Sequence, residues 1–400
     1  MMSSLKKILI IDQVSVPVLV GMKNLIANGF DVQFVTWSSK VRRVALLGIG
    51  VSLVKTIKDP EDKDFAHLIE TVVRQIDPHV IIPFSFRAWT GLVKIPAACN
   101  LIPTVSPEKY SIVNNKDLCR QFFSGTEFYQ PRRYRDIHEA NALAVEYFPL
   151  VVKISEGTGV YEGVRYVSNW EELLSCIGEF KRQGLRIDDL VIEEFVPGVV
   201  FDIAGIAWEG KVADMIIQKR SISFPISGGV GAINVTVDDP SLERIGARII
   251  NNSNYTGPFQ IEVKLVGEKF FVVEFNPKFW GTLDLSVKAG KNFPADLVRL
   301  KLGETFVRDY GAYEKNLMYK FNFPQWGSAR SQLKARYGNA FKLAIKSERV
   351  VTDFCAAGFI HWCFSMLQFY LGGQVRKDPN YLVDPILEKG LEINVENDRL

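Results

Sequence analysis

Three oxygen-bearing side chains interrupt otherwise apolar strands of this sequence. The stretch VVEFNPKFWG, residues 272–281, ends an apolar run with Glu274 and Asn276, and Pro277 then stops it. Residues i and i+2 of a strand point to the same face, so this carboxylate and this amide share one side. Glu262 lies on a second apolar run, TGPFQIEVKL, and a Val-Gly-Glu-Lys turn joins the two. We therefore expect a β-hairpin in which Glu262 and Glu274 lie roughly opposite each other.

Two carboxylates and an amide oxygen on one face repel one another unless a cation lies between them. Mg²⁺ prefers hard oxygen ligands and is commonly bound by one or two carboxylates together with substrate phosphates. The alternative is an ordinary solvated face, because antiparallel sheets are often polar on one side. The three residues alone leave both interpretations open.

Two further segments could bind phosphate or a base. Lys153 lies on the apolar strand PLVVKI, and a loop with Gly157, Gly159 and Gly163 follows. The backbone N–H groups of such a loop can close around phosphates, and the lysine adds a point charge. We expect this loop, residues 155–163, to be mobile without nucleotide and ordered with it. The second segment, LVIEEFVPG, is either an exposed strand end or a linker whose backbone holds an adenine edge.

The elements that must position these residues follow two patterns. Strands are expected at 6–12, 31–36 and 79–84, with helices at 17–28 and 61–78 between them. Alternating strands and helices indicate a parallel α/β sheet, although no G-x-G-x-x-G motif follows the first strand. After residue 147 the strands are separated by short turns, which indicates an antiparallel-rich α+β layout. A domain boundary near residue 110 follows from this change.

Composition limits the class of protein. A chain of 400 residues suits two or three domains, and 47% hydrophobic with 23% charged residues is typical of a folded globular protein. The net charge is +3, from 48 basic and 45 acidic side chains, which argues against nucleic acid as the main partner. The 5 cysteines show no C-x-x-C spacing and indicate free thiols in a reducing compartment, hence a cytoplasmic protein. The segment MMSSLKKILIID is interpreted as a first strand, not as a signal peptide.

The C-terminal tail contains a basic segment beside an apolar one. Residues 330–349 are rich in Lys and Arg, and residues 354–371 contain no Asp, Glu, Lys or Arg. This combination could contact an anionic membrane surface. A helix that packs on its own chain or across a homodimer interface explains it as well, because a buried helix can be apolar all round. We expect the second arrangement.

The order of these segments resembles the ATP-grasp superfamily, and within it the carbamoyl-phosphate-synthase-like ATP-grasp ligases, over roughly residues 75–303. The most specific match is VVEFNPKFWG followed by a small-residue helix that ends in AGKNFP. The resemblance implies an α/β N-terminal Rossmann-like domain (1–110), an α+β ATP-grasp domain (111–305, with two lobes split near 196) and an extra C-terminal helical extension (306–400).

The resemblance also implies roles for individual residues, position by position. Metal ligands would be Glu262, Glu274 and Asn276. The nucleotide would be bound by Lys116, Lys153, Gly157, Thr158, Gly159, Glu193, Glu194, Phe195, Val196 and Asp202. Lys278 replaces the arginine that the family usually has two residues after the asparagine. An ammonium point charge therefore takes the place of a guanidinium that can bind phosphate or carboxylate in a bidentate way. Lys219 and Arg220 are further candidates for contact with the γ-phosphate or the substrate carboxylate.

An ATP-dependent carboxylate–amine ligase is the function that the resemblance implies. It would form an acyl phosphate, release ADP and phosphate, and require ATP and Mg²⁺, two ions or Mn²⁺ in their place. A small-molecule kinase of the same fold and a non-catalytic nucleotide-binding protein are the alternatives. Small-molecule carboxylates and amines are the expected partners, and the sequence names neither one.

Overall fold

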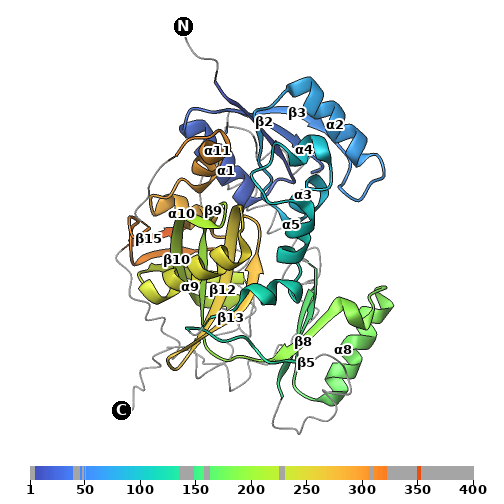
Figure 1. Ribbon diagram of the computed structural model, residues 1–400, viewed down its shortest axis with the longest axis vertical. Coiled ribbons are helices and arrows are strands. Elements are labelled where there is room, and N and C mark those ends of the chain that lie inside the picture. The colour runs from blue at the N-terminus through green and yellow to red at the C-terminus, as the bar shows by residue number, and fades with distance from the viewer. Residues whose placement is uncertain are drawn as a thin grey trace, which may run out of the picture.

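The computed structural model describes residues 5–38, 46, 49, 51–125, 127–134, 148–156, 163–224, 230–305, 310–321 and 349–352. Within them the strands form three sheets, of four, seven and four strands. Figure 1 shows the first sheet with its helices at one end of the molecule, the seven-stranded sheet in the middle and the third sheet at the opposite end.

The N-terminal sheet is parallel, as the sequence predicts, with strand order β3-β2-β1-β4. Strand β3 was not expected, because this short edge strand pairs with β2 alone and leaves Leu53 39% exposed. Amphipathic helix α2 lies within the predicted helix 61–78 and buries Phe65, Ile69, Val72 and Ile76, which lie on one face. The elements are β1 (Lys7–Ile11), α1 (Val16–Ala27), β2 (Asp31–Thr36), β3 (Ser52–Thr56), α2 (Phe65–Ile76), β4 (Val80–Ile81), α3 (Phe86–Leu92), α4 (Pro96–Cys99) and α5 (Pro107–Asn114).

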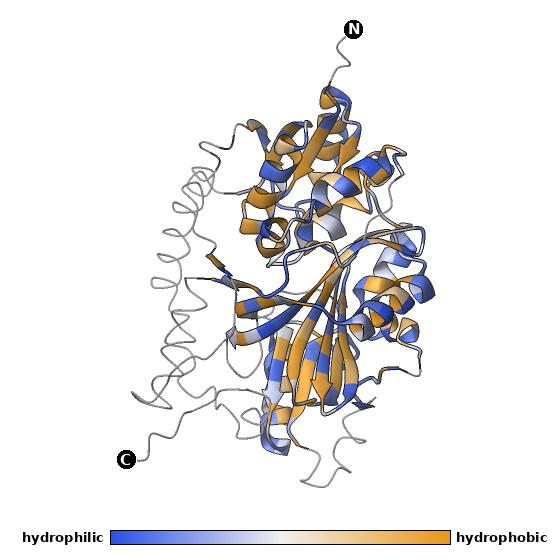
Figure 2. Cartoon of the chain, turned by 90° about the vertical axis from the view of Figure 1, so that its left-hand side faces the viewer, coloured by the Kyte–Doolittle hydropathy of each residue, from blue (hydrophilic) through white to orange (hydrophobic). Residues whose placement is uncertain are grey.

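The central sheet has the order β13-β12-β9-β10-β11-β14-β15, and its pairs are antiparallel except for the last. Figure 2 shows that its strands carry mostly hydrophobic residues. Helix α9 packs on one face through Leu242, Ile245 and Ile249. Helices α10 and α11 and the N-terminal sheet with helix α1 pack on the other face. The elements are β9 (Val199–Trp208), β10 (Lys211–Phe224), β11 (Val230–Val237), α9 (Pro240–Ser253), β12 (Gly257–Val266), β13 (Lys269–Asn276), α10 (Leu283–Lys288), α11 (Phe293–Lys301), β14 (Leu317–Lys320) and β15 (Arg349–Thr352).

A small lobe stands apart from this sheet at the lower right of Figure 1. Its strands have the order β5-β8-β6-β7, and helix α8 packs against them through its own core, which includes Leu173, Ile177 and Phe180. Asn169 caps α8 by accepting a hydrogen bond from the Glu172 amide, and its last turn carries Lys181 and Arg182, which complement the helix dipole. The elements are η2 (Leu118–Phe122), which leads into the lobe, β5 (Arg133–Tyr134), β6 (Leu150–Ile154), β7 (Val164–Val167), α8 (Trp170–Arg182), η4 (Ile187–Asp189) and β8 (Leu190–Glu194).

One face of the N-terminal parallel sheet and one face of the central sheet share a hydrophobic core. It joins Ile8 and Ile10 of β1 to Ala204 and Ile206 of β9. The Phe84 and Phe279 rings stack across the junction with centroids 4.7 Å apart. These two parts are therefore packed as one body, and the small lobe has its own core.

The predicted tail lies mostly outside the described residues. Of the extension 306–400, which the resemblance implies to be helical, residues 310–321 and 349–352 are described, and they contribute strands β14 and β15 to the central sheet. Strand β15 pairs in parallel with β14, and Arg349 forms an ion pair with Glu314 at 2.8 Å. The apolar segment 354–371 and residues 330–348 are not among the described residues. In the ranges that the structure does describe, no helix has the length and apolar character needed to span a membrane.

Candidate functional site

The hairpin predicted from the sequence is confirmed. Strands β12 and β13 pair so that Glu262 lies directly opposite Glu274, and Gln260 opposite Asn276. Strand β9 adds a third carboxylate, because Asp202 is the partner of Glu262 on its other side. We call Asp202, Glu262 and Glu274 the carboxylate row. Direct cross-strand partners point to the same face of a sheet. The two glutamates, Asp202 and Asn276 therefore lie on one face, opposite to the face that α9 covers.

Each carboxylate of this row has a cationic partner. Lys116 Nζ lies 3.4 Å from Glu274 Oε1. Arg220 Nη2 lies 2.7 Å from Asp202 Oδ1 and 3.1 Å from Glu262 Oε1. Burial raises the pKa of Glu262 above its usual value, although Arg220 opposes the shift. Burial acts on Glu274 in the same direction, but the nearby lysines, Lys116 first, hold the pKa of that carboxyl below its usual value.

Lys153 reaches the same region from the small lobe. Its side chain is 7% exposed and forms an ion pair with Glu193, whose carboxylate also lies 3.4 Å from Arg120 Nη1. Burial opposes the charge of Lys153, yet the carboxylates of Glu193 and Glu274 raise its pKa above the ordinary value. A buried lysine that stays charged between two carboxylates is suited to bind phosphate oxygens.

The linker between the lobes, residues 195–198, joins β8 to β9 and is held against strand β12. Lys264 Nζ donates to the carbonyl oxygen of Val196 at 2.7 Å and lies 4.7 Å from the centroid of the Phe195 ring. Gly198 has a φ of 136°, and a Cβ on it would come within 2.3 Å of the carbonyl oxygen of Leu265. Burial, aided by Lys153, lowers the pKa of Lys264 to about 8.

Three residues of this site were not predicted from the sequence: Lys264, Tyr166 and Arg120. Lys264 follows Glu262 by two positions and so shares its face, which the pattern QIEVKL could have indicated. Tyr166 and Glu193 are both partners of Val151, and the Tyr166 ring packs edge-on against Phe195 at 5.7 Å. Burial raises the pKa of Tyr166 to about 12. No local signal could have placed Tyr166 or Arg120 here, because both reach the site through long-range pairing.

Asn234 is a further polar residue of this face. It is the partner of Arg220 across β10 and β11 and is fully buried. Neither its amide nitrogen nor its amide oxygen has a hydrogen-bond partner within the part of the chain that the structure describes. Buried amides usually have such partners, often ordered water.

The remaining predicted residues fall into three groups. Lys278 lies near Glu274 and Glu262, and burial lowers its pKa despite these carboxylates. Glu194 accepts a hydrogen bond from the Arg132 amide, 2.9 Å away. Lys219 neighbours Arg220 on β10, so strand alternation turns it to the opposite face, away from the carboxylate row. Gly157, Thr158 and Gly159 lie outside the described residues.

The donor set fits a hard cation at the Glu262–Glu274 pair. Two carboxylates and the Asn276 amide share one face of the sheet, and Lys153 and Lys278, which could bind phosphate, lie near Glu274. Over the described ranges, no cluster of three or more His, Cys, Asp or Glu side chains has metal-binding geometry. A cation here would therefore depend on the amide and on ligands brought by a nucleotide.

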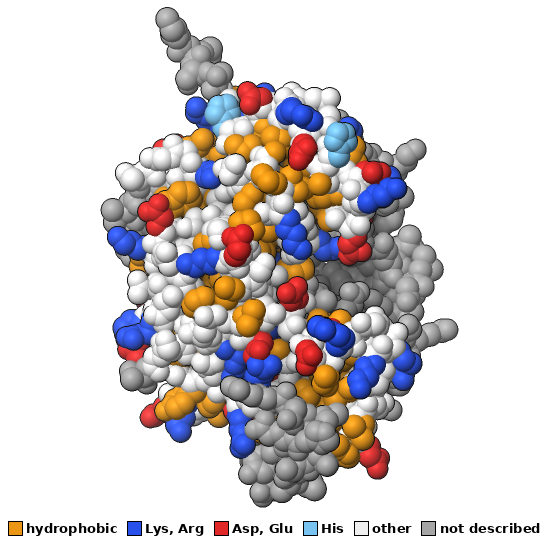
Figure 3. All heavy atoms as spheres, turned by 45° about the vertical axis from the view of Figure 1, so that its right-hand side comes forward, with side chains coloured by type: hydrophobic (Ala, Val, Ile, Leu, Met, Phe, Trp, Pro, Cys, Tyr) orange, Lys and Arg blue, Asp and Glu red, His pale blue; other side chains and the backbone are white. Residues whose placement is uncertain are grey.

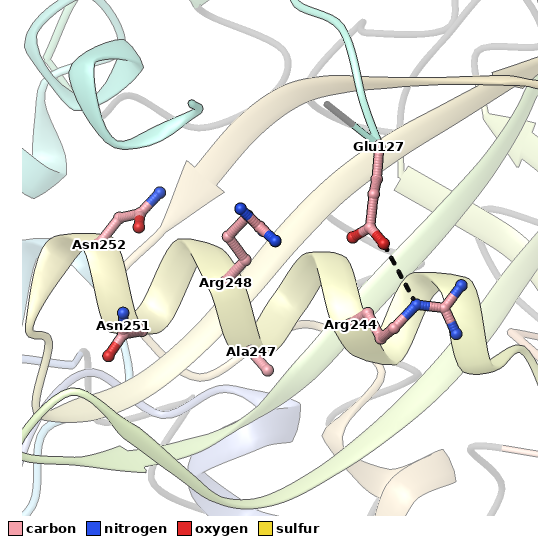
Figure 4. A pocket seen from close by; sticks show the side chains of 6 residues that line it. All are labelled: Glu127, Arg244, Ala247, Arg248, Asn251 and Asn252. Atoms are coloured by element: carbon pink, nitrogen blue, oxygen red, sulfur yellow. Dashed lines mark ion pairs between the residues drawn. The ribbon is translucent and has the colours of Figure 1, made fainter. Parts of the chain in front are cut away.

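A surface pocket of about 430 Å³ lies elsewhere, on the outer side of helix α9. Figure 4 shows Arg244, Arg248 and Asn252 projecting from this helix, with Glu127 above them and 3.4 Å from Arg244. Helix α9 covers the face of the sheet opposite to the glutamates, so this shallow pocket is not part of the site.

Comparison with known proteins identifies the fold. The family described as "ATP-grasp in the biosynthetic pathway with Ter operon" matches residues 186–320. An L-amino acid ligase from Bacillus licheniformis is similar in structure, with a TM-score of 0.56, 17% identity and 75% of each chain covered. No curated protein matches the sequence.

Two further solved structures are similar. The biotin carboxylase domain dimer of Hydrogenobacter thermophilus 2-oxoglutarate carboxylase, in complex with MgADP, ADP and bicarbonate, has a TM-score of 0.62 and 12% identity, over 79% of this chain and 74% of that chain. Phosphoribosylglycinamide synthetase from Anaerococcus prevotii has a TM-score of 0.52 and 16% identity, with 76% of each chain covered. The resemblance seen in the sequence is confirmed: this chain has the ATP-grasp fold.

Proposed function

We propose that this protein is an ATP-dependent carboxylate–amine ligase. In the first step a substrate carboxylate oxygen attacks the γ-phosphorus, the bond from this phosphorus to the bridging oxygen breaks, and ADP leaves. In the second step an amine nitrogen attacks the acyl carbon of the acyl phosphate, the carbon–oxygen bond to phosphate breaks, and phosphate leaves. The amine gives up a proton in this step.

The observation that carries the proposal is the Glu262–Glu274 pair, which lies with Asn276 among cations from both lobes. The similarity to an L-amino acid ligase and to phosphoribosylglycinamide synthetase supports carbon–nitrogen bond formation. Burial raises the pKa of the described thiols, those of Cys99, Cys119 and Cys176, which argues against a cysteine nucleophile. Such a site acts by positioning and by neutralising charge.

Roles follow from the placement of the residues. Glu262, Glu274 and Asn276 would hold one or two Mg²⁺ ions, or Mn²⁺, which would neutralise the negative charge of bound phosphates. Lys153 and Lys116 would bind the phosphates from the small lobe and its approach. The backbone of residues 193–196 would hold the adenine, and Tyr166 and Phe195 would flank it. Lys278 and Arg220 would steady the transferred phosphoryl group and the acyl oxygen.

The domain limits remain proposals: residues 1–110, residues 111–305 with lobes split near 196, and the extension 306–400. A cytoplasmic protein that takes small-molecule substrates is part of the same proposal. The side chains of both signs that are interspersed on the face shown in Figure 3 are consistent with the proposed absence of nucleic acid among its partners.

One experiment tests the reaction class. The protein is incubated with ATP, Mg²⁺ and amino acids, singly and in pairs, and phosphate and ADP are measured. Release that requires two co-substrates together supports a ligase. Dependence on one co-substrate, with a phosphorylated product, would instead indicate a kinase. The absence of turnover together with tight nucleotide binding would indicate a non-catalytic binding protein.

A further inference from the structure

Arg220 occupies the place between two acidic side chains of the carboxylate row. A single nitrogen, Nη2, contacts both Asp202 and Glu262, at 2.7 and 3.1 Å. The Arg220 side chain is 8% exposed and that of Asp202 is 2% exposed. Gln260 Nε2 donates to the same Asp202 oxygen at 3.0 Å, which fixes the carboxylate that holds the arginine. A buried charge pair of this kind is costly to break one-sidedly.

The charge balance around the glutamates favours an anion over a free cation. Among the described residues that interact electrostatically here, six are cationic and four are carboxylates, an excess of two positive charges. A free divalent cation would add two more charges beside Arg220, whereas a nucleotide brings negative phosphates. The cations are Lys116, Arg120, Lys153, Arg220, Lys264 and Lys278, and the carboxylates are Glu193, Asp202, Glu262 and Glu274.

We propose that Arg220 is a resident counter-cation of the metal site, which excludes free metal ions and admits them only together with a nucleotide. The proposal rests on the proposed function in that Glu262 is taken as a metal ligand. Without nucleotide, the guanidinium satisfies Glu262 and a metal ion has to compete with it. With nucleotide, the phosphates offer Arg220 another anionic partner, and Glu262 becomes available to the metal. Arg220 thus couples the binding of the metal ion to the binding of the nucleotide.

Metal binding to the full chain tests this directly. Mn²⁺ serves as the probe, and free Mn²⁺ is measured by electron paramagnetic resonance with and without ADP. Arg220→Met should bind Mn²⁺ without ADP at least about tenfold more tightly than the native protein, because the guanidinium charge that competes with the metal ion for Glu262 is gone. Arg244→Met removes the same charge from the outer side of α9 and should change nothing. An unchanged or weaker affinity in Arg220→Met would overturn the proposal.

Thermal unfolding provides a second measurement in case Arg220→Met is destabilised. Millimolar Mg²⁺ without nucleotide should raise the Tm of Arg220→Met and leave that of the native protein nearly unchanged, because only a bound ligand stabilises the folded state. Arg220→Lys keeps the charge and should behave like the native protein. Equal Mg²⁺ responses of Arg220→Met and Arg220→Lys would contradict an electrostatic role.

The outcomes separate this proposal from the proposed function. If no protein binds Mn²⁺ even with ADP, the metal site and the ligase function fail together, and the role of Arg220 falls with them. If all of them bind Mn²⁺ with ADP but Arg220→Met gains no affinity for free Mn²⁺, only the role of Arg220 fails.

Discussion

At the scale of single residues, the site depends on carboxylates that are held in place by cations before any ligand binds. Glu274 shows this best, because Lys116 lies 3.4 Å away and nearby lysines lower its pKa. A carboxylate kept ionised in this way is ready to bind a metal ion at neutral pH. Its charge, more than its shape, is what the site uses.

Replacing that charge is the first residue-scale prediction. Glu274→Gln keeps the shape and should keep the fold, but ATP turnover should fall by about two orders of magnitude or more, the scale of losing a preorganised electrostatic group. Phosphate release measures turnover, and circular dichroism checks folding. Glu268→Gln, in the exposed hairpin turn, is the matched control. Near-normal turnover of Glu274→Gln would contradict the assignment.

Lys264 gives a prediction on pH. Its pKa is about 8 in the folded protein and ordinarily 10.5. Between these values the unfolded chain still holds a proton that the native state has released, so this group makes stability rise with pH in that window. Relative to Lys264→Met, the native protein should therefore gain on the order of 1–3 kcal/mol of unfolding free energy from pH 7 to 10.

Urea unfolding at several pH values measures this difference. Lys269→Met, on the exposed start of β13, is the control and should show no comparable trend. A difference between the native protein and Lys264→Met that does not change with pH would mean that Lys264 keeps its ordinary pKa in the fold.

Local pattern was enough to predict some residues of the site and not others. The hairpin with Glu262 and Glu274 follows from alternation and a short turn, both readable within 20 residues or so. Arg120 and Tyr166 could not be placed, since their contacts with Glu193 and Phe195 join segments far apart in the sequence. The cationic partner of Glu262 could not be predicted either. Arg220 and Lys219 are adjacent basic residues, and only the strand register shows which of them faces the carboxylate row. The same limit applies to the fold, because strand β3 is a short edge strand whose pairing with β2 local pattern does not predict.

At the scale of elements, the linker between the lobes is held tightly where it joins the central sheet. Gly198 has a backbone conformation that favours glycine, and it lies directly against the carbonyl oxygen of Leu265. Any change in lobe position must therefore be absorbed outside this contact.

The corresponding prediction concerns two glycines. Gly198→Ala should destabilise the protein by about 2–3 kcal/mol, from backbone strain together with the close contact, which lies 2.3 Å from a backbone oxygen. Gly267→Ala, at φ 60° in the hairpin turn with open space around it, should cost only about 1 kcal/mol. Chemical denaturation measures both. Equal costs would mean that the linker is not pinned to β12.

At the scale of the whole molecule, the cores predict how the protein opens. Strands β1 and β9 contribute to one core, whereas the small lobe has a separate and smaller one. Amides of β6 and β8 should therefore exchange with solvent at lower denaturant than those of β1 and β9, which should become exchangeable together. Hydrogen exchange with mass spectrometry resolves the two groups. Exchange of β1 before β9 would contradict a shared core.

The excess of positive charge around the glutamates also governs how fast a ligand arrives. Long-range attraction increases the frequency of productive encounters with an anion, and dissolved ions screen it over about 10 Å at 0.1 M ionic strength. The association rate constant of a nucleoside triphosphate should accordingly fall steeply as salt is added, while its dissociation rate constant changes little. Stopped-flow measurement over a range of salt concentrations would show this asymmetry, and the cations around the glutamates would then set the speed of capture as well as its strength.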